Sequence, residues 1–268
     1  MTIDIGVVLA GGTGSRLLPL TRVLNKHMLP VNGKPMLHWP LRTLAQLGID
    51  RAIVVLGGRS CGEVIEQFRS SYDTGEGVIA LSYVYQEGAG GIPAALREAL
   101  PTLEAMRADR AVVILGDNVF PTLPAGLLGE SLVLAEDAAL VIAKPVDDAS
   151  SYGCVALGHE GRIDGEHSLV EKPRIPPPAG TTWAAILGVY DLPMDGLRST
   201  LEALVPSARG ELEIVDVLNA FRLQGRLGAH LTYDAWIDAG DPPGYALAND
   251  PSFWRDAPEA KWPAGGRS

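Results

Sequence analysis

With 268 residues, 47% of them hydrophobic, the chain can bury the core of one large α/β domain or of a domain with a substantial insertion. Its 22 Lys and Arg against 32 Asp and Glu give a net charge of −10, which disfavours a nucleic-acid or anionic-membrane surface. There is no run of 18 apolar residues and no basic segment followed by an apolar one at the N-terminus, so we expect no membrane span, no signal peptide and a cytoplasmic location. Two distant cysteines and five histidines without close ligand spacing indicate neither a disulfide framework nor a zinc site.

The first strong pattern is a glycine-rich segment that follows a short apolar run, Ile5–Leu9. Three glycines within four positions let the backbone turn out of a buried strand: Gly11, Gly12 and Gly14. Glycines also let backbone N–H groups approach an anion closely, and Arg16 and Lys26 add two positive charges near the same loop. This composition predicts a phosphate-binding loop.

Two common phosphate motifs do not fit this loop. A Walker loop needs Gly-Lys-Ser/Thr, but Ser15 and Arg16 follow the last glycine, and the dinucleotide fingerprint G-x-G-x-x-G meets Leu17 where its third glycine belongs. What remains is G-G-x-G-x-R, then a Lys ten residues after the Arg, then Leu-Pro. This pattern resembles the sugar nucleotidyltransferases, and most closely the glucose-1-phosphate thymidylyltransferase group.

In that family the loop holds a nucleoside triphosphate, and an Arg and a Lys bind its phosphates. The resemblance therefore implies phosphate contacts for Arg16 and Lys26. It implies nucleotide contacts for the loop residues Leu9, Gly11, Gly12 and Gly14. The alternative is a glycine-rich turn between a strand and a helix that carries two surface cations.

Helix and strand patterns alternate after the loop. Apolar spacing predicts a helix over 35–47, a strand over 52–56, a helix over 62–68 and a strand over 79–85. Such an order predicts a parallel sheet whose ligand lies beyond the carboxyl ends of the strands, where the glycine-rich loop also lies.

A second segment that resembles the family begins at Gln86, directly after the strand over 79–85. The thymidylyltransferases read Q-P-S-P-D-G-L-A-Q-A there, and their Gln and Gly read the edge of the pyrimidine base; Gln86 and Gly91 match, whereas the residues between them differ. A primary amide both donates to and accepts from a base edge, so Gln86 keeps the chemistry for reading a base. The differences leave the choice of base open, and the alternative is that Gln86 only caps a loop.

The third pattern is the strand over 111–115 followed by Gly116 and Asp117. Asp117 therefore emerges at the carboxyl end of a central parallel strand, on the side of the glycine-rich loop. The segment resembles the family's L-G-D-N motif, whose Asp binds magnesium, and Mg²⁺ prefers carboxylate and phosphate oxygens. The alternative is an Asx turn that closes the strand.

Three segments resemble the sugar half of the family's site. Tyr152 and Gly153 match its Y-G-V segment, where the Gly leaves room for a sugar hydroxyl at the backbone. Glu171 and Lys172 match its E-K-P motif, which implies a carboxylate for sugar hydroxyls and a cation for the sugar phosphate; the alternative is a solvated pair before a turn. In the strand over 183–190, Leu187 stands where the family has a Thr, which removes a hydroxyl near the sugar.

The last matching segment contains Trp236 and Asp238. The family reads W-L-D-T-G-T, and the resemblance implies a sugar contact for Trp236 and a second magnesium ligand in Asp238, with Asp241 in place of a Thr. Asp117 and Asp238 are 121 residues apart, so only the fold brings them together. The alternative is that Asp238 caps a helix that begins at the prolines after it.

The remaining patterns are structural. We expect helices up to Glu136, over 193–204 and over 212–224, and strands over 138–143 and 227–233. Glu211, Glu213 and Asp216 resemble a metal cluster, but their place at the start of the helix over 212–224 favours a role at its positive end. Longer thymidylyltransferases continue with helices for subunit packing and a regulatory nucleotide site, so the resemblance implies a short form without that regulation and leaves a homo-oligomer open.

The predicted fold is a Rossmann-like α/β domain over 1–250, mostly parallel and flanked by helices, with a nucleotide-binding part over about 1–145, an inserted sugar-binding part over about 146–240 and a tail over 251–268. The resemblance implies nucleotidyl transfer with Mg²⁺ from a nucleoside triphosphate, dTTP favoured, to a sugar-1-phosphate, glucose-1-phosphate favoured. The catalytic residues that it implies are Arg16, Lys26, Asp117, Lys172 and Asp238. One alternative is the same reaction with GTP, CTP or UTP and an unusual sugar or cyclitol phosphate. Another is a catalytically silent sugar-nucleotide-binding regulator.

Overall fold

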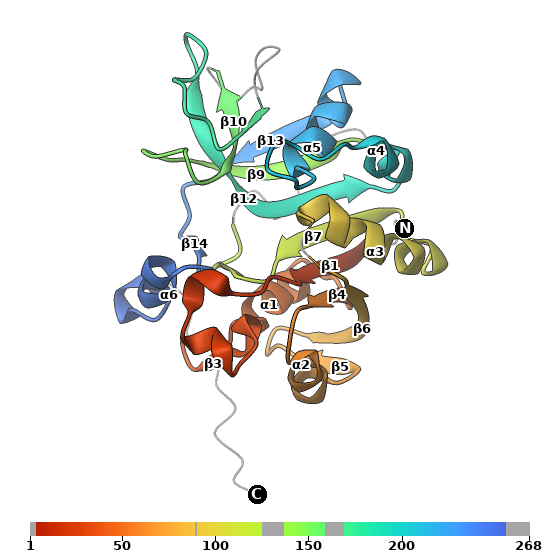
Figure 1. Ribbon diagram of the computed structural model, residues 1–268, viewed down its shortest axis with the longest axis vertical. Coiled ribbons are helices and arrows are strands. Elements are labelled where there is room, and N and C mark those ends of the chain that lie inside the picture. Colours follow the sequence, from red (N-terminus) through yellow and green to blue (C-terminus); the bar gives the residue numbers. More distant parts are fainter. Residues whose placement is uncertain (1–3, 89, 125–136, 159–168, 256–268) are drawn as a thin grey trace, which may run out of the picture.

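The computed structural model describes residues 4–88, 90–124, 137–158 and 169–255 (Figure 1). Its strands are β1 (Asp4–Ala10), β2 (Pro30–Val31), β3 (Lys34–Pro35), β4 (Arg51–Gly57), β5 (Ser71–Asp73), β6 (Val78–Gln86), β7 (Arg110–Leu115), β8 (Asn118–Val119), β9 (Ala139–Pro145), β10 (Gly153–Leu157), β11 (Leu169–Glu171), β12 (Thr182–Pro193), β13 (Leu227–Leu231) and β14 (Ile237–Asp238). Its helices are α1 (His38–Gln46), α2 (Cys61–Phe68), α3 (Ile92–Ala105), α4 (Leu197–Ala203), α5 (Ile214–Leu223) and α6 (Pro242–Ala248).

The main sheet has the strand order β11-β10-β12-β7-β1-β4-β6-β5, and β9 joins β12 to β13. Strands β7, β1, β4 and β6 are parallel neighbours, whereas β12 adds antiparallel to β7. The predicted α/β fold is confirmed. Because β1 lies between β7 and β4, the loops after these strands meet at one edge of the sheet.

The alternation of side chains along β1 explains why helices cover both faces of the sheet. Ile5, Val7 and Leu9 enter one apolar cluster together with α3, α4 and α5. Val8 and Ala10 point the other way and pack with side chains of α1 and α2. A strand that is buried on both faces reads as a continuous apolar run, as β1 does.

Strand β12 joins the two halves of the molecule. Its last residues, 189–193, pair with β7, and its first residues, 182–185, pair with β10. The register against β9 shifts between Ile186 and Tyr190, at Gly188, whose φ is 64°. In Figure 1 this strand runs between the sheet of β1, β4 and β6 and the upper strands β10 and β13.

A third apolar cluster brings the end of the chain back to its beginning. Leu17, Trp39 and Val119 pack there with Ile237 and Ala248, all of them buried. Strand β14 pairs antiparallel with β8, and α6 lies beside the segment that contains β3 (Figure 1). This cluster positions the loop after β14 against the loop after β7.

Several predicted boundaries move by a few residues, each for a local reason. Helix α1 begins at His38 instead of residue 35, because Pro35 pairs with Pro30 in a short hairpin. Helix α4 begins after Gly196, because β12 continues through Pro193. The helix predicted up to Glu136 lies outside the described residues, and the division into nucleotide and sugar parts stays a prediction. No helix in the described ranges is long and apolar enough to cross a membrane.

Candidate functional site

The loop after β1 carries Lys26 into the centre of the molecule. The chain leaves β1 at Ala10, and Lys26 begins a short 3-10 helix that ends at Met28. A Cβ atom at Gly12 would lie 3.0 Å from the Lys26 Nζ atom, so this glycine leaves room for the ammonium group. From there the Lys26 Nζ donates to the Asp117 Oδ2 at 2.6 Å, and both side chains are about nine-tenths buried.

The pairing of β8 with β14 brings Asp117 and Asp238 together. Asp238 lies opposite Asn118 in this pair, and the Ala239 N–H donates to the Asp117 carbonyl at 2.9 Å. A Cβ atom at Gly240 would lie 2.6 Å from the Asp117 Oδ2 and 2.8 Å from the Asp238 Oδ1. The two carboxylates therefore face the same small space, which a larger residue at 240 would fill.

The two carboxyl groups have opposite electrostatic environments. Burial acts to raise the pKa of Asp117, but the charge and hydrogen bond of Lys26 hold that pKa below its ordinary value. Burial raises the pKa of Asp238 most, and the negative charge of Asp117 raises it further. A cation between the two carboxylates relieves this repulsion, and two carboxylates with phosphate oxygens are a donor set that suits Mg²⁺. In the described ranges no group of three or more His, Cys, Asp or Glu side chains is placed to hold a metal.

Arg16 lies at the rim of this centre. Its side chain is 63% exposed, its Nη1 is 4.0 Å from the Asp241 Oδ2, and its Nη2 is 3.4 Å from the Cβ position of residue 240. Asp241 is the residue that caps α6, because its Oδ1 accepts the Gly244 N–H at 2.9 Å. Asp238 instead accepts the Gly240 N–H at 2.8 Å, so the interpretation of Asp238 as the helix cap is wrong.

The predicted base-reading residues lie beside the same loop. Gln86 ends β6, is buried, and its Oε1 lies 2.7 Å from the position that a Cβ at Gly11 would take. Gly91, with φ of 83°, precedes α3 and contacts the Leu212 backbone. Leu9 contributes its carbonyl to the Gly116 N–H at 2.9 Å, and its side chain is buried in the core.

The predicted sugar-binding residues form a second group that touches the first. Gly153 pairs with Glu171 across β10 and β11, and the Lys172 N–H donates to the Tyr152 carbonyl at 2.8 Å. The Tyr152 ring lies 5.6 Å from the Trp236 ring. The Trp236 Nε1 in turn donates to the Asn118 Oδ1, next to Asp117. The structure thus connects the E-K-P segment to the Asp117–Asp238 centre through two aromatic side chains.

Two residues at this site were missed by the sequence analysis. Arg209 donates from its Nη2 to Glu171 at 3.1 Å and to Glu213 at 2.7 Å, so Glu213 is held in this ion-pair network instead of capping α5. His27 is fully buried beneath Gly116. This burial lowers the pKa of His27 to about 3, and the positive charge of Lys26 adds to the effect. The sequence contained a local signal for Arg209, because Glu211 and Glu213 follow it within four residues.

The expectation that Leu187 removes a hydroxyl near the sugar stays a prediction. The Leu187 side chain is fully buried in the cluster with α1 and α2, and the partly buried Trp236 packs against the same cluster. The register of β12 against β9 shifts between Ile186 and Tyr190, yet the faces of β12 still alternate: these two residues enter the cluster with α3, whereas Leu187 and Val189 enter the cluster with α1.

Comparisons with known proteins show the family of the chain. The family model described as Nucleotidyl transferase matches residues 5–251. The low-salt glycan biosynthesis nucleotidyltransferase Agl11 of Haloferax volcanii is 30% identical over 91% of this chain, which spans 64% of that protein's length. The glucose-1-phosphate thymidylyltransferase of Actinoplanes sp. is 33% identical over 88% of this chain and 73% of that protein.

A solved structure leads to the same family. A Bacillus anthracis protein described as a glucose-1-phosphate thymidylyltransferase, in complex with sucrose, is similar with a TM-score of 0.79 and 34% identity, over 94% of this chain and 96% of that one. The family-model match spans both the glycine-rich loop and the Asp238 segment. The chain therefore belongs to the nucleotidyl transferase family of enzymes.

Proposed function

We propose that the protein transfers a nucleotidyl group from a nucleoside triphosphate to a sugar-1-phosphate, giving a nucleoside diphosphate sugar and pyrophosphate. The observation that carries this proposal is the convergence of Lys26, Asp117 and Asp238 between the glycine-rich loop and the Glu171–Lys172 segment. A site with phosphate-binding groups on one side and a sugar-type carboxylate and cation on the other suits two phosphorylated substrates.

In this reaction an oxygen of the sugar phosphate forms a bond to the α-phosphorus, and the bond from that phosphorus to the bridging oxygen breaks. Pyrophosphate leaves with the electron pair of the broken bond, so no protein nucleophile is required. The protein binds and orients the two substrates and neutralises their charge, with Arg16 and Lys26 at the triphosphate and Lys172 at the attacking phosphate.

Asp117 and Asp238 would hold Mg²⁺. The fit rests on two carboxylates that face one space and on the raised pKa of Asp238, which burial and the charge of Asp117 produce. When bound, Mg²⁺ supplies positive charge to phosphoryl oxygens. The ring of His27 lies below this centre and is neutral near pH 7, because burial and the charge of Lys26 lower its pKa to about 3.

The base and the sugar are narrower proposals. Gln86 provides an amide at the base side, and dTTP with glucose-1-phosphate is the favoured pair. The segment after Gln86 differs from the thymidylyltransferase pattern, so UTP, CTP or GTP with another sugar or cyclitol phosphate is the alternative.

The experiment is pyrophosphate release with Mg²⁺ across dTTP, UTP, CTP, GTP and ATP, each against several sugar-1-phosphates. We expect rapid release with one preferred pair and a loss of about a thousandfold in Asp117→Asn, because the variant weakens charge neutralisation at the reacting phosphates. The matched control is Asp191→Asn, which disturbs the buried ion pair with Arg110 at the far end of β7. Asp191→Asn should keep its turnover. Silence with every pair, or wild-type rates in Asp117→Asn, would contradict the proposed function.

A further inference from the structure

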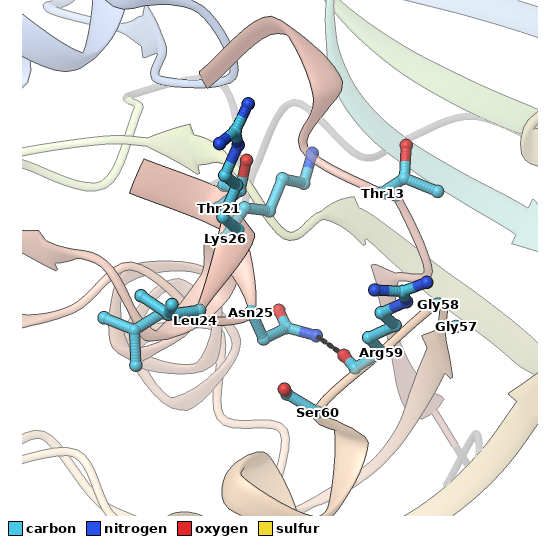
Figure 2. A pocket seen from close by; sticks show the side chains of 12 residues that line it. Thr13, Thr21, Leu24, Asn25, Lys26, Gly57, Gly58, Arg59 and Ser60 are labelled. Atoms are coloured by element: carbon cyan, nitrogen blue, oxygen red, sulfur yellow. Dashed lines mark hydrogen bonds between the residues drawn. The ribbon is translucent and has the colours of Figure 1, made fainter. Parts of the chain in front are cut away.

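A cavity of about 350 Å³ lies between the glycine-rich loop and the turn from β4 to α2. Thr13 lines it from the loop, Thr21 and Lys26 from the following segment, and Arg59 and Ser60 from the turn. Figure 2 shows Thr13 and Arg59 on one side of this space and Thr21 and Lys26 on the other. The volume is at the lower end for ligand pockets, which suits a diphosphate better than a whole nucleoside triphosphate.

The charge of the cavity is positive in a chain whose net charge is −10. Arg22, Lys26 and Arg59 line it, and no carboxylate is among its described lining residues. The Lys26 ammonium is already bound to Asp117, whereas within the described ranges neither arginine side chain has a hydrogen-bond or ion-pair partner. Unpaired guanidinium groups, with the hydroxyls of Thr13 and Ser60, are suited to bind an anion.

Two contacts fix the backbone of the turn that carries the exposed Arg59 side chain. A Cβ atom at Gly57 would lie 2.7 Å from the Gly11 carbonyl oxygen, so the turn packs directly against the glycine-rich loop. The Asn25 Nδ2 donates to the Arg59 carbonyl at 3.3 Å, as the dashed line in Figure 2 marks. Because Asn25 immediately precedes Lys26, the same short segment supports both cations.

Lys26 forms the boundary between this cavity and the reacting centre. It lines the cavity, and its Nζ is 2.6 Å from the Asp117 Oδ2. A triphosphate whose α-phosphorus lies at the Asp117–Asp238 centre therefore has its next two phosphoryl groups within reach of the cavity.

We infer that Arg59, from the turn between β4 and α2, extends the phosphate site of the glycine-rich loop and binds, together with Lys26, the β- and γ-phosphoryl groups that leave as pyrophosphate. The inference rests on the proposed function and adds a second loop to phosphate binding. The planar guanidinium presents two N–H groups to a phosphate at once, and it stabilises the charge that develops on the bridging oxygen as its bond to the α-phosphorus breaks.

The test compares Arg59→Gln with Arg51→Gln, which removes a charge at the opposite, exposed end of the same strand β4. Isothermal titration with inorganic pyrophosphate and Mg²⁺ measures binding without nucleotide, and steady-state kinetics measures the KM of each substrate. For Arg59→Gln we expect the pyrophosphate Kd and the KM of the triphosphate to rise about ten- to a hundredfold, with the KM of the sugar phosphate unchanged. Arg59→Lys should restore part of the loss, and Arg51→Gln should behave as wild type.

The outcomes separate this inference from the proposed function. If wild-type enzyme turns over and Arg59→Gln leaves pyrophosphate binding and the triphosphate KM unchanged, the inference is wrong and the function stands. If pyrophosphate binding depends on Arg59 but no substrate pair gives turnover, the anion site is supported and the proposed transferase reaction is contradicted. Equal effects on both substrate KM values would also contradict the inference, because they would indicate a general structural defect.

Discussion

The two ends of the site hold their charges in different ways. At the nucleotide end, the side chains of Lys26 and Asp117 are each 11% exposed and form a single pair. At the sugar end, Glu171 is 22%, Arg209 39% and Lys172 46% exposed, and they form a network with Glu213. Coulombic attraction is strong where water is excluded and weak where it is not.

This difference suggests a division of labour. The buried pair is fixed before any substrate arrives, so it is suited to the chemical step that every substrate pair shares. The Glu171 network (Glu171, Lys172, Arg209 and Glu213) is solvated, so its members can exchange protein partners for sugar and phosphate groups. We therefore expect the buried pair to govern rate and the network to govern substrate affinity.

The largest effect is expected for Lys26→Gln. The variant removes the phosphate-binding cation and leaves Asp117 buried without its partner, so kcat/KM for the triphosphate should fall about a thousandfold and the free energy of unfolding by about 3 kcal/mol. Steady-state kinetics and urea unfolding measure the two quantities.

The control for Lys26→Gln is Arg110→Gln. Arg110 and Asp191 form a similarly buried pair, 15% and 14% exposed, at the opposite end of β7. This variant should lose comparable stability with kcat/KM unchanged. Equal kinetic losses in both variants would show that Lys26 acts only through stability.

A smaller effect is expected for Arg209→Gln. Arg209 forms ion pairs with both Glu213 and Glu171, so the variant should let the Glu171 side chain move. The KM of the sugar phosphate should then rise about tenfold, and the KM of the triphosphate should stay the same. Arg198→Gln is the control, because Arg198 also joins two glutamates, Glu104 and Glu202, but on the outer surface of α4. A change in kcat alone would contradict the assignment of Arg209 to sugar positioning.

The sequence was sufficient for the buried end of the site and less so for the exposed end. The apolar runs of β1 and β7 place the glycine-rich loop and Asp117 at one sheet edge, since parallel strands end together. The segment after the loop then carries Lys26 to Asp117. The convergence of Asp238 depends on the third apolar cluster, which no local pattern reveals.

The exposed end was harder because its partners are distant in sequence. Arg209 and Glu171 are 38 residues apart and meet only because α5 packs near β11, so the helix-start interpretation of Glu213 overlooked its pairing with Arg209. Local rules fail where tertiary ion pairs decide the outcome.

The smallest effect concerns the free energy of unfolding at acidic pH. We expect its pH dependence to arise in the half of the molecule that contains the buried Lys26–Asp117 pair. In that half, burial lowers the pKa of His38 to about 4, and the positive charges of Lys34 and Arg42 add to this effect. The His38 Nδ1 lies 3.0 Å from the Tyr72 hydroxyl. The pKa of a His in the unfolded chain is about 6.5. Between pH 6.5 and about 4, the unfolded chain therefore binds a proton at this residue that the folded chain does not bind. The free energy of unfolding therefore falls as the pH drops through this window, by roughly 1 kcal/mol at about pH 5.5 from this residue.

Urea unfolding at two pH values measures this fall, and His38→Gln should reduce it by that amount. The control Tyr72→Phe keeps the titrating ring, so it should show the same fall in the free energy of unfolding as wild type. If His38→Gln and wild type lose equal stability, the acid sensitivity belongs to other residues.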